Sequence, residues 1–425
     1  MLKDTAFQMA ASNIRFGRGI TDELGMDLVA MDVRRTMVVI DPALVSLPAG
    51  ETVLASLEEN GIDYQVFDAV SVEPTDSSFK AAAEFAVSGN FDSVVAVGGG
   101  STIDTAKAAN LYSTHPADFF DYVNAPIGKG LPVPGPLKPL IAVPTTAGTG
   151  SETTGVAIFD YVEKHAKTGI AHRHLKPTLG IVDPDNTVSL PPAVAASSGL
   201  DVLSHALESY TAMPFNERPM PPRPLERPAY QGSNPISDIW ALTALELMAE
   251  FLPNAVADTS DVEAREKMLL AAALAGIGFG NAGVHLPHGM SYPVAGMVAG
   301  YIPPGYDVDH SMVPHGISVI LNTPAVVRFT APASPERHLR AAAALGADIE
   351  RASTTDAGEI LADRVIHFMR MLDVPNGLSA VGYTTADIPG LVEGTLPQHR
   401  VTKLSPKPAN ESDLTSLFEA SMTIW

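Results

Sequence analysis

One aspartate and three histidines in the second half of the chain have the types and spacing of a divalent-metal site. Asp201 and His205 lie in GLDVLSHALESY, His288 in HLPHGMSYP and His315 in VPHGIS. Residues four apart project from nearly the same face of a helix, so Asp201 and His205 share a cavity if this apolar-periodic stretch is helical. Carboxylate and imidazole ligands suit zinc or ferrous iron, and the absence of cysteine excludes thiolate ligands.

The metal interpretation competes with an ordinary one, because 12 histidines in 425 residues produce some helical pairs by chance. A lone Asp and His four apart is usually a capping or surface pair. His288 and His315, however, both lie in His-Gly dipeptides with apolar neighbours, where an unpaired imidazole would be costly to bury. His285 competes with His288 for the third ligand position, and spacing alone does not choose between them.

A glycine-rich turn in VVAVGGGSTIDTAKAAN predicts a phosphate or dinucleotide site. Glycines after a buried strand let the backbone approach a pyrophosphate, and the following helix offers free N–H groups and positive dipole character. The same turn also suits a simple connection between strand and helix. The residues that we expect to contact the cofactor here are Gly98, Gly99, Gly100, Ser101 and Asp104.

Two further segments suit a dinucleotide. Asp41 ends the strand pattern RRTMVVID, where a carboxylate accepts from ribose hydroxyls and repels a 2′-phosphate, so NAD is favoured over NADP. The polar run VPTTAGTGSE is either an ordinary loop or a second cofactor contact, through Thr145, Thr146, Thr149 and Ser151. A literal G-x-G-x-x-G at Gly278, Gly280 and Gly283 follows an alanine-rich helix, which is the wrong context for a dinucleotide fingerprint.

Composition limits the partners and the compartment. The net charge of −21 repels nucleic acid and anionic lipid surfaces, and we expect no apolar run to approach the length of a membrane span. The first residues, MLKDTAFQMAASNIRFGRG, lack the apolar core of a secretory signal, and zero cysteines fit a reducing interior. We therefore expect a soluble cytoplasmic protein without nucleic-acid or membrane partners, acting on small molecules as a homo-oligomer.

The elements that must position these residues change character near residue 190. Strand-like and helix-like segments alternate up to LGIVDP, which predicts a parallel sheet with crossover helices. Beyond it the chain is rich in Ala and Leu with helical periodicity, as in NPISDIWALTALELMAEFL. The sequence therefore predicts an α/β dinucleotide-binding domain over 1–190 and a helical metal-binding and substrate domain over 191–425.

These motifs together resemble the iron-containing, group III alcohol dehydrogenases. GGGSTIDTAK, PTTAGTGSE, DVLSHALE, HGMSYP and VPHG carry the resemblance, which covers essentially the whole chain. It implies a dehydroquinate synthase-like fold, with an N-terminal α/β parallel-sheet domain, an all-α C-terminal domain, and NAD and one ion, Fe²⁺ or Zn²⁺, in the cleft between them. By motif, the implied metal ligands are Asp201, His205, His288 and His315, and Lys167 would lie near the ribose.

Longer stretches, among them FFDYVNAPIGKG, RPAYQGSNPISDIWA and AGIGFGNAGVH, are similar to the branch of this family that exchanges hydride between hydroxy and oxo acids. That likeness implies oxidation of 4-hydroxybutyrate to succinate semialdehyde and reduction of 2-oxoglutarate to D-2-hydroxyglutarate through bound NAD. An NAD-dependent alcohol or 4-hydroxybutyrate dehydrogenase with exchangeable cofactor is the alternative. A catalytically silent NAD-binding sensor is a third reading, against which the four-ligand set argues.

One departure from the family pattern concerns Tyr292, which stands where many members carry a histidine four residues after the HGM histidine. A proton relay through that histidine is therefore in doubt here. Both substrates would also need a basic residue for a remote carboxylate. AHRHLKP and HRVTKL offer basic clusters, but surface roles are commoner for such residues, and the sequence names no anchor.

Overall fold

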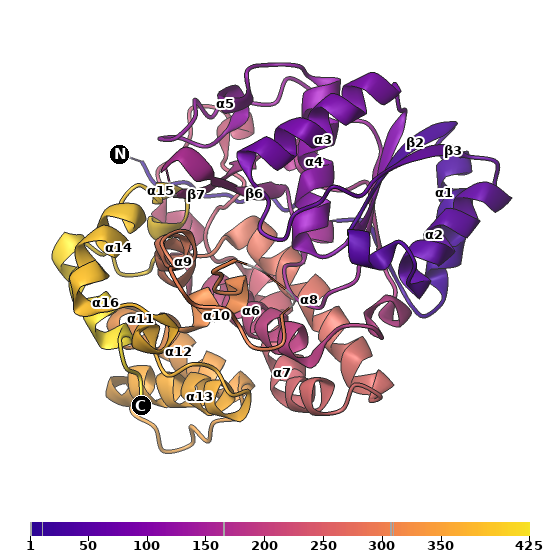
Figure 1. The fold of residues 1–425 in the computed structure, drawn as a ribbon. Helices are drawn as coiled ribbons and strands as arrows, with labels where there is room; N and C mark the ends of the chain where they lie inside the picture. Colours follow the sequence, from indigo (N-terminus) through magenta and orange to yellow (C-terminus); the bar gives the residue numbers. More distant parts are fainter. Residues whose placement is uncertain (1, 11, 165, 307, 309) are drawn as a thin grey trace. The chain divides into compact units, whose positions relative to one another are not determined.

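The computed structural model describes residues 2–10, 12–164, 166–306, 308 and 310–425. Its chain forms two units, one comprising Ala10–Leu190 and the other the first nine residues together with Pro191–Trp425. All the strands described lie in the first unit, and the second is helical, which confirms the predicted fold class (Figure 1). The assignment of domains to 1–190 and 191–425 stays a prediction.

The α/β unit follows the predicted alternation of strands and helices. Its strands are β1 (Ile14–Phe16), β2 (Arg35–Ile40), β3 (Asp63–Phe67), β4 (Ser93–Gly98), β5 (Leu140–Pro144), β6 (Val156–Tyr161), β7 (Ala166–Ala171) and β8 (Leu179–Val182). Its helices are α1 (Leu24–Ala30), α2 (Pro48–Glu59), α3 (Asp76–Gly89), α4 (Gly100–Thr114) and α5 (Phe119–Tyr122).

Six strands form a parallel sheet in the order β1-β8-β5-β4-β2-β3. Because alternate side chains point to opposite faces of a strand, β2 and β4 supply two cores. Val38 and Val95 pack with α1 and α2 on one face, whereas Met37 and Val94 pack with α3 and α4 on the other (Figure 1). Burial on both faces explains why these strands are continuously apolar rather than alternating.

The antiparallel pair of β6 and β7 was not predicted from the sequence. Its strands include charged residues, Asp160 and Lys167, so the segment lacks a clear apolar period. Phe159 and Ile170 nevertheless reach a third core with residues of α3 and α4. The pair therefore packs against the same helices that cover one face of the main sheet.

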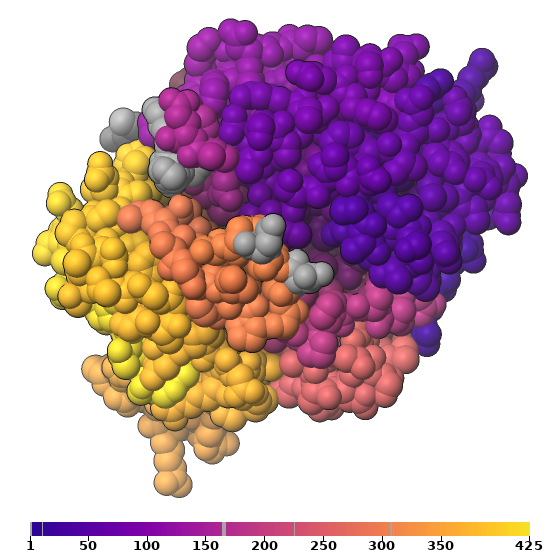
Figure 2. All heavy atoms as spheres, in the orientation of Figure 1, coloured from indigo at the N-terminus to yellow at the C-terminus, as the bar shows by residue number. Residues whose placement is uncertain are grey.

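The helical unit begins where the sheet ends. Its helices are α6 (Pro192–Thr211), α7 (Pro235–Ala257), α8 (Val262–Ala282), α9 (Leu286–Gly296), α10 (His315–Ile320), α11 (Thr323–Thr330), α12 (Pro335–Ala344), α13 (Ala357–Met371), α14 (Ile388–Thr395), α15 (His399–Thr402) and α16 (Glu411–Ser421). The long α6 packs against α7, α8 and α10, so the segment that carries Asp201 and His205 lies at the centre of this unit. In Figure 2 the orange segment before His315 lies at the surface beside the yellow C-terminal residues.

Helix α7 is long and apolar enough to cross a membrane by length and composition, contrary to the expectation that no segment reaches that length. The helix begins at Pro235, where the Asn234 side chain caps it by accepting from the backbone N–H groups of Ile236 and Ser237. It packs against both α6 and α8. Core helices of proteins without a membrane span share this apolar composition.

The buried carboxyl group of Glu152 gives the α/β unit a measurable pH dependence. Burial raises the pKa of Glu152 to about 7, against the opposing charge of Lys107. A raised pKa in the folded state means that stability is full below the ordinary value of 4.5 and falls as pH rises to 7. The loss is at most about 3 kcal/mol, since each pKa unit corresponds to about 1.4 kcal/mol.

We therefore expect Glu152→Gln to remove part of the decline in Tm between pH 5 and pH 8. Thermal unfolding of the variant and the wild type should converge at pH 5 and diverge at pH 8, with the variant more stable there. The exposed Glu51→Gln is the matched control and should follow the wild type. If Tm depended on pH in the same way in the wild type and in Glu152→Gln, a raised pKa of Glu152 would not be the cause of the decline.

Candidate functional site

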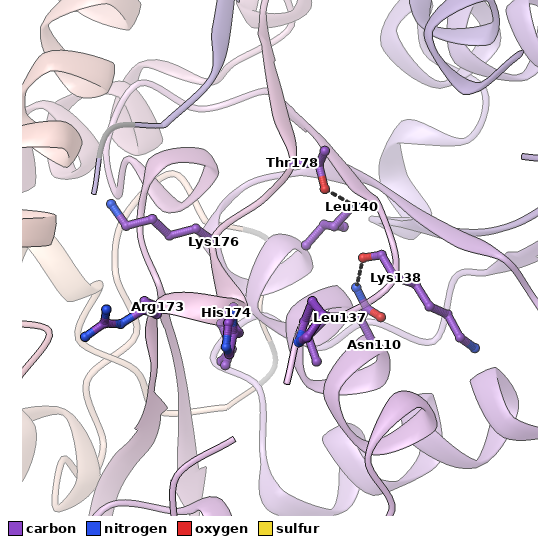
Figure 3. A pocket seen from close by; sticks show the side chains of 10 residues that line it. Asn110, Leu137, Lys138, Leu140, Arg173, His174, Lys176 and Thr178 are labelled. Atoms are coloured by element: carbon purple, nitrogen blue, oxygen red, sulfur yellow. Dashed lines mark hydrogen bonds between the residues drawn. The ribbon is translucent and has the colours of Figure 1, made fainter. Parts of the chain in front are cut away.

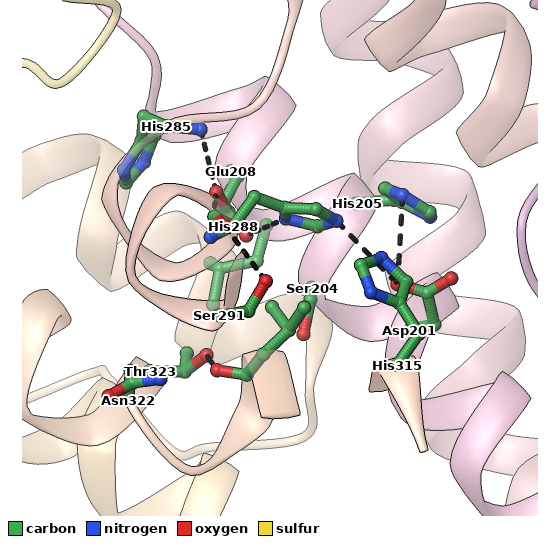
Figure 4. A network of polar contacts seen from close by, with 12 residues as sticks. Asp201, Ser204, His205, Glu208, His285, His288, Ser291, His315, Asn322 and Thr323 are labelled. Carbon is green, nitrogen blue, oxygen red and sulfur yellow. Dashed lines mark hydrogen bonds and ion pairs between the residues drawn. The ribbon is translucent and has the colours of Figure 1, made fainter. Parts of the chain in front are cut away.

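The four predicted metal ligands come together in the helical unit. Asp201 and His205 lie one turn apart on α6, His288 is in the first turn of α9, and His315 begins α10. The Oδ1 atom of Asp201 lies 3.6 Å from Nε2 of His205, 3.6 Å from Nε2 of His288 and 3.8 Å from Nε2 of His315. Figure 4 shows the four side chains converging.

These separations fit a single ion. Donor atoms about 2.1 Å from a tetrahedrally bound ion lie about 3.4 Å from one another. One ligand atom each from Asp201, His288 and His315 lies within 4.8 Å of the others, and His205 adjoins this group through Asp201. The chain's own geometry therefore matches a small divalent cation with nitrogen and oxygen ligands.

Two orphaned atoms in this cluster also point to a cation. Asp201 Oδ1 and His288 Nε2 are buried and lack a hydrogen-bond partner in the described part of the chain. Burial acts to raise the pKa of Asp201, but His205, His315 and His288 outweigh it and hold that pKa below its ordinary value. A buried carboxylate and an unpaired ring nitrogen are costly without a cation between them.

Glu208 orients one of the proposed ligands, His288, and was not predicted from the sequence. Its Oε1 lies 2.6 Å from Nδ1 of His288, and its Oε2 accepts from the backbone N–H of His285 at 2.6 Å. Burial acts to lower the pKa of His288, but Glu208 and Asp201 together outweigh it and raise the pKa to about 10. On the same helix, Glu208 lies seven residues after Asp201 and three after His205. Both spacings place it on the face that carries the two ligands, so the sequence did contain a signal for it.

The competing ligand His285 has a different role. Its Nε2 lies 3.0 Å from the hydroxyl of Thr211, and its main-chain N–H is held by Glu208. The ring is thus engaged on the side of Glu208 away from Asp201, as Figure 4 shows. Phe279, also not predicted, stacks on His205 with ring centroids 3.9 Å apart and fixes the plane of that imidazole.

The predicted cofactor segments of the α/β unit gather at one edge of its sheet. Ile40 pairs with Val97, and Gly98 pairs with Pro144, so the strands before Asp41, Gly99 and Thr145 end side by side. This carboxyl edge is where open α/β sheets bind nucleotides. Close packing requires the glycines here, because a Cβ on Gly100 would lie 2.6 Å from Thr149.

Three predicted cofactor residues are engaged within the protein itself. Asp104 accepts from the Ser151 hydroxyl and from the backbone N–H of Ile158, and Lys107 donates to both Asp104 and Ser151. Lys167 is buried and forms ion pairs with Glu73 and Asp160. These contacts brace the loop behind the glycine turn, so the side chains of Asp104, Ser151 and Lys167 already have partners there.

The remaining predicted cofactor residues lie near the glycine turn. Thr146 packs against Gly99, the backbone N–H of Thr145 donates to Gly98, and Ser101 accepts from the backbone N–H of Glu73. Asp41 caps the following turn through Ala43. Their cofactor contacts stay predictions.

The basic cluster in AHRHLKP lies at the opposite edge of the sheet. Arg173, His174 and Lys176 line a cavity of about 210 Å³ with Leu140 and Thr178, at the amino ends of β5 and β8 (Figure 3). The glycine turn follows the carboxyl end of β4. This cluster is therefore separated by the length of the sheet from the predicted cofactor loops.

Tyr292, the departure from the family pattern, is buried on α9 one turn after His288. Its hydroxyl accepts a hydrogen bond of 2.8 Å from Nη2 of Arg400. Arg400 comes from the second basic cluster, HRVTKL, on α15, and α15 packs against α9.

Comparison with known proteins supports the sequence resemblance. Residues 11–184 match the family model for iron-containing alcohol dehydrogenase, and residues 226–422 match the Fe-containing alcohol dehydrogenase family, C-terminal. The chain is 60% identical to the mitochondrial hydroxyacid-oxoacid transhydrogenase of Bos taurus, over 99% of this chain and 91% of that protein.

Solved structures agree with this likeness. A 1,3-propanediol oxidoreductase superposes with a TM-score of 0.85 at 28% identity, covering 98% of this chain and all of that one. Sulfoacetaldehyde reductase from Bifidobacterium kashiwanohense, in complex with NAD⁺, has a TM-score of 0.81 at 27% identity, covering 99% of this chain and 100% of that chain.

The expectation of a cytoplasmic protein is wrong. The matched relatives from Bos taurus, Mus musculus and Homo sapiens are all named mitochondrial, which points to the mitochondrion. The expectation rested on composition, on the lack of cysteine and on first residues that do not resemble a targeting signal. Composition and cysteine content do not distinguish the cytoplasm from another reducing compartment, and the first residues were misleading.

Replacing Asp201 by Asn should remove the anionic ligand while keeping the side-chain volume. We expect metal content and affinity to fall at least about tenfold, because a neutral amide is a weaker ligand than a carboxylate. Metal analysis and chelator competition on the purified variant test this. Ser204→Ala, on the same buried helix but bonded only to the Leu200 carbonyl, should retain its metal.

Replacing Glu208 by Gln should weaken metal binding although Glu208 is not itself a ligand. Partners that orient a ligating histidine typically contribute 10- to 100-fold in affinity, so we expect about that loss with the fold intact. Zinc titration against a chromogenic chelator measures it. Thr211→Val, which removes the bond to His285 but leaves His288 untouched, should bind zinc like the wild type, and an unchanged affinity in Glu208→Gln would refute the role.

Proposed function

Because the chain belongs to the iron-containing alcohol dehydrogenase family and is therefore an oxidoreductase, we propose that it is a hydroxyacid-oxoacid transhydrogenase. Its substrates would be 4-hydroxybutyrate, oxidised to succinate semialdehyde, and 2-oxoglutarate, reduced to D-2-hydroxyglutarate. The observation that carries the proposal is 60% identity to a protein of that name over 99% of the chain. Residues 191–425 would hold the metal and substrate, and residues 1–190 would hold NAD.

The cluster around Asp201 supports a metal-assisted reaction. A bound divalent ion, Fe²⁺ or Zn²⁺, would polarise the reacting carbon–oxygen bond, and NAD would carry the hydride. Asp201, His205, His288 and His315 would hold the ion, while Glu208 keeps Nε2 of His288 directed at it. Burial lowers the pKa of His205 to about 3, whereas Glu208 and Asp201 raise that of His288, so an ion that binds here would displace a proton from His288.

The two half-reactions balance without an external oxidant. The hydroxy acid loses a hydride and a proton, and the oxo acid gains a hydride at its keto carbon and a proton on its oxygen. Bound NAD would supply the carrier that takes the hydride from one half-reaction to the other. A cofactor that stays bound distinguishes this reaction from that of an ordinary dehydrogenase, which releases it at each turnover.

Transfer of deuterium tests the proposal directly. Purified protein with bound NAD is incubated with 2-oxoglutarate and 4-hydroxybutyrate deuterated at carbon 4, without added cofactor. We expect deuterium at carbon 2 of D-2-hydroxyglutarate, detected by mass spectrometry, and equal amounts of succinate semialdehyde. Asp201→Asn is the control that should form neither product.

A second arm adds excess unlabelled NADH. If the cofactor stays bound, the product keeps its deuterium, because solution NADH does not enter the site. Dilution of the label would instead indicate an NAD-dependent dehydrogenase with exchangeable cofactor. Absence of D-2-hydroxyglutarate from protein with confirmed bound NAD and metal would reject the transhydrogenase.

A further inference from the structure

Arg400 is an unusual cation within the helical unit. Its side chain is half-buried, and its Nη1 is shielded from solvent without a hydrogen-bond partner in the described chain. Its Nη2 donates to the Tyr292 hydroxyl, and its guanidinium lies 5.1 Å from the centre of the Tyr230 ring. Two tyrosines thus hold the guanidinium, and no carboxylate of the described residues forms an ion pair with it.

Two contacts connect this guanidinium with the metal cluster. Tyr292 follows His288 by one turn of α9, which is a rise of about 6 Å along the helix. Tyr230 meets Phe279 edge to face, and Phe279 stacks on His205. Arg400 is therefore connected to His288 through one residue, Tyr292, and to His205 through two, Tyr230 and Phe279.

The unpaired guanidinium requires an explanation. The chain has 48 acidic residues for 27 basic ones, so ion-pair partners are plentiful elsewhere on the molecule. A shielded cation without one loses hydration and gains little in return, unless an anion binds there. A guanidinium with free donors suits a carboxylate, which it binds through two parallel hydrogen bonds.

We propose that Arg400, oriented by the Tyr292 hydroxyl, binds the carboxylate of the substrate that lies remote from the reacting carbon. This inference rests on the proposed function. In 4-hydroxybutyrate the carboxylate carbon is three carbon–carbon bonds from carbon 4, and in 2-oxoglutarate the far carboxylate carbon is three bonds from carbon 2. A single anchor therefore serves both half-reactions with the reacting carbon at the same place.

Other cations of the chain fit this role less well. Arg173 and Lys176 belong to the cavity at the amino ends of β5 and β8, at the edge of the sheet away from the glycine turn. Lys403, three residues after Arg400, is exposed. Its charge is hydrated in the free protein, so it offers a matched control for the loss of one positive charge in the same segment.

The test compares Arg400→Gln with Lys403→Gln on substrates with and without the carboxylate. For Arg400→Gln we expect kcat/KM for 4-hydroxybutyrate to fall about 100-fold, mainly through KM, while kcat/KM for 1-butanol changes less than about threefold. Lys403→Gln should match the wild type on both. Calorimetry with glutarate, which has both carboxylates but no reacting group, should show the same loss of binding in Arg400→Gln alone.

Tyr292→Phe and Arg400→Lys refine the test. Tyr292→Phe keeps the cation but removes its hydrogen-bond acceptor, so we expect a smaller loss, about tenfold, again confined to the carboxylate substrates. Arg400→Lys keeps the charge without the planar fork and should lie between Arg400→Gln and the wild type. If Arg400→Gln does not fold, the ratio of kcat/KM for 4-hydroxybutyrate to kcat/KM for 1-butanol is measured in Arg400→Lys instead. A lower ratio than in the wild type would support the anchor, and an unchanged ratio would contradict it.

The outcomes separate this inference from the proposed function. Equal losses of kcat/KM on 4-hydroxybutyrate and 1-butanol would make Arg400 merely structural, and unchanged kcat/KM on both substrates in Arg400→Gln would place the anchor elsewhere. In both cases the proposed transhydrogenase function would be unaffected, provided that the wild type prefers the carboxylate substrate. A wild type that shows no such preference would overturn both.

Discussion

The Asp201 carboxylate is the constraint on which the helical unit depends. It is buried at the centre of α6, and Nε2 atoms from three helices lie within 3.8 Å of its Oδ1. A charge in such surroundings is stabilised only by a cation or by donors, and the nearby rings offer lone pairs once they are neutral. Because His288 of α9 and His315 of α10 both meet α6 at this carboxylate, we expect metal binding and the stability of this region to be coupled.

In the α/β unit, the sheet and a buried lysine position the loops that are predicted to bind the cofactor. Parallel pairing brings the carboxyl ends of β2, β4 and β5 to one edge. Lys107, buried beneath, donates to Asp104, Ser151 and the Val156 carbonyl and so fixes the loop from Thr145 to Ser151. A loop that is already rigid would lose less conformational entropy on binding a pyrophosphate. The buried Lys107 contributes to that rigidity.

The sequence was informative where a pattern is local and less so where partners are distant along the chain. Strand and helix order followed from apolar periodicity, and the family followed from motifs such as GGGSTIDTAK. The convergence of Asp201 and His205 follows from helical spacing, but no local rule separates His288 from His285. That difference depends on Glu208, which orients one ring and holds only the backbone of the other. Asp104 was predicted from its position after the glycines, whereas two of its partners, Ser151 and Ile158, lie about fifty residues away.

Tyr292 and Arg400 are best understood together. Many relatives carry a histidine at the position of Tyr292, and a histidine beside Arg400 would be kept neutral by the adjacent charge. A tyrosine hydroxyl instead accepts from Nη2 of the guanidinium at 2.8 Å, while Nη1 has no hydrogen-bond partner among the described residues. In a chain with a net charge of −21, an anionic substrate meets unfavourable long-range repulsion, so its affinity must come from a short-range contact. A shielded guanidinium supplies that contact at low dielectric, where it is least weakened by salt and by the acidic surface.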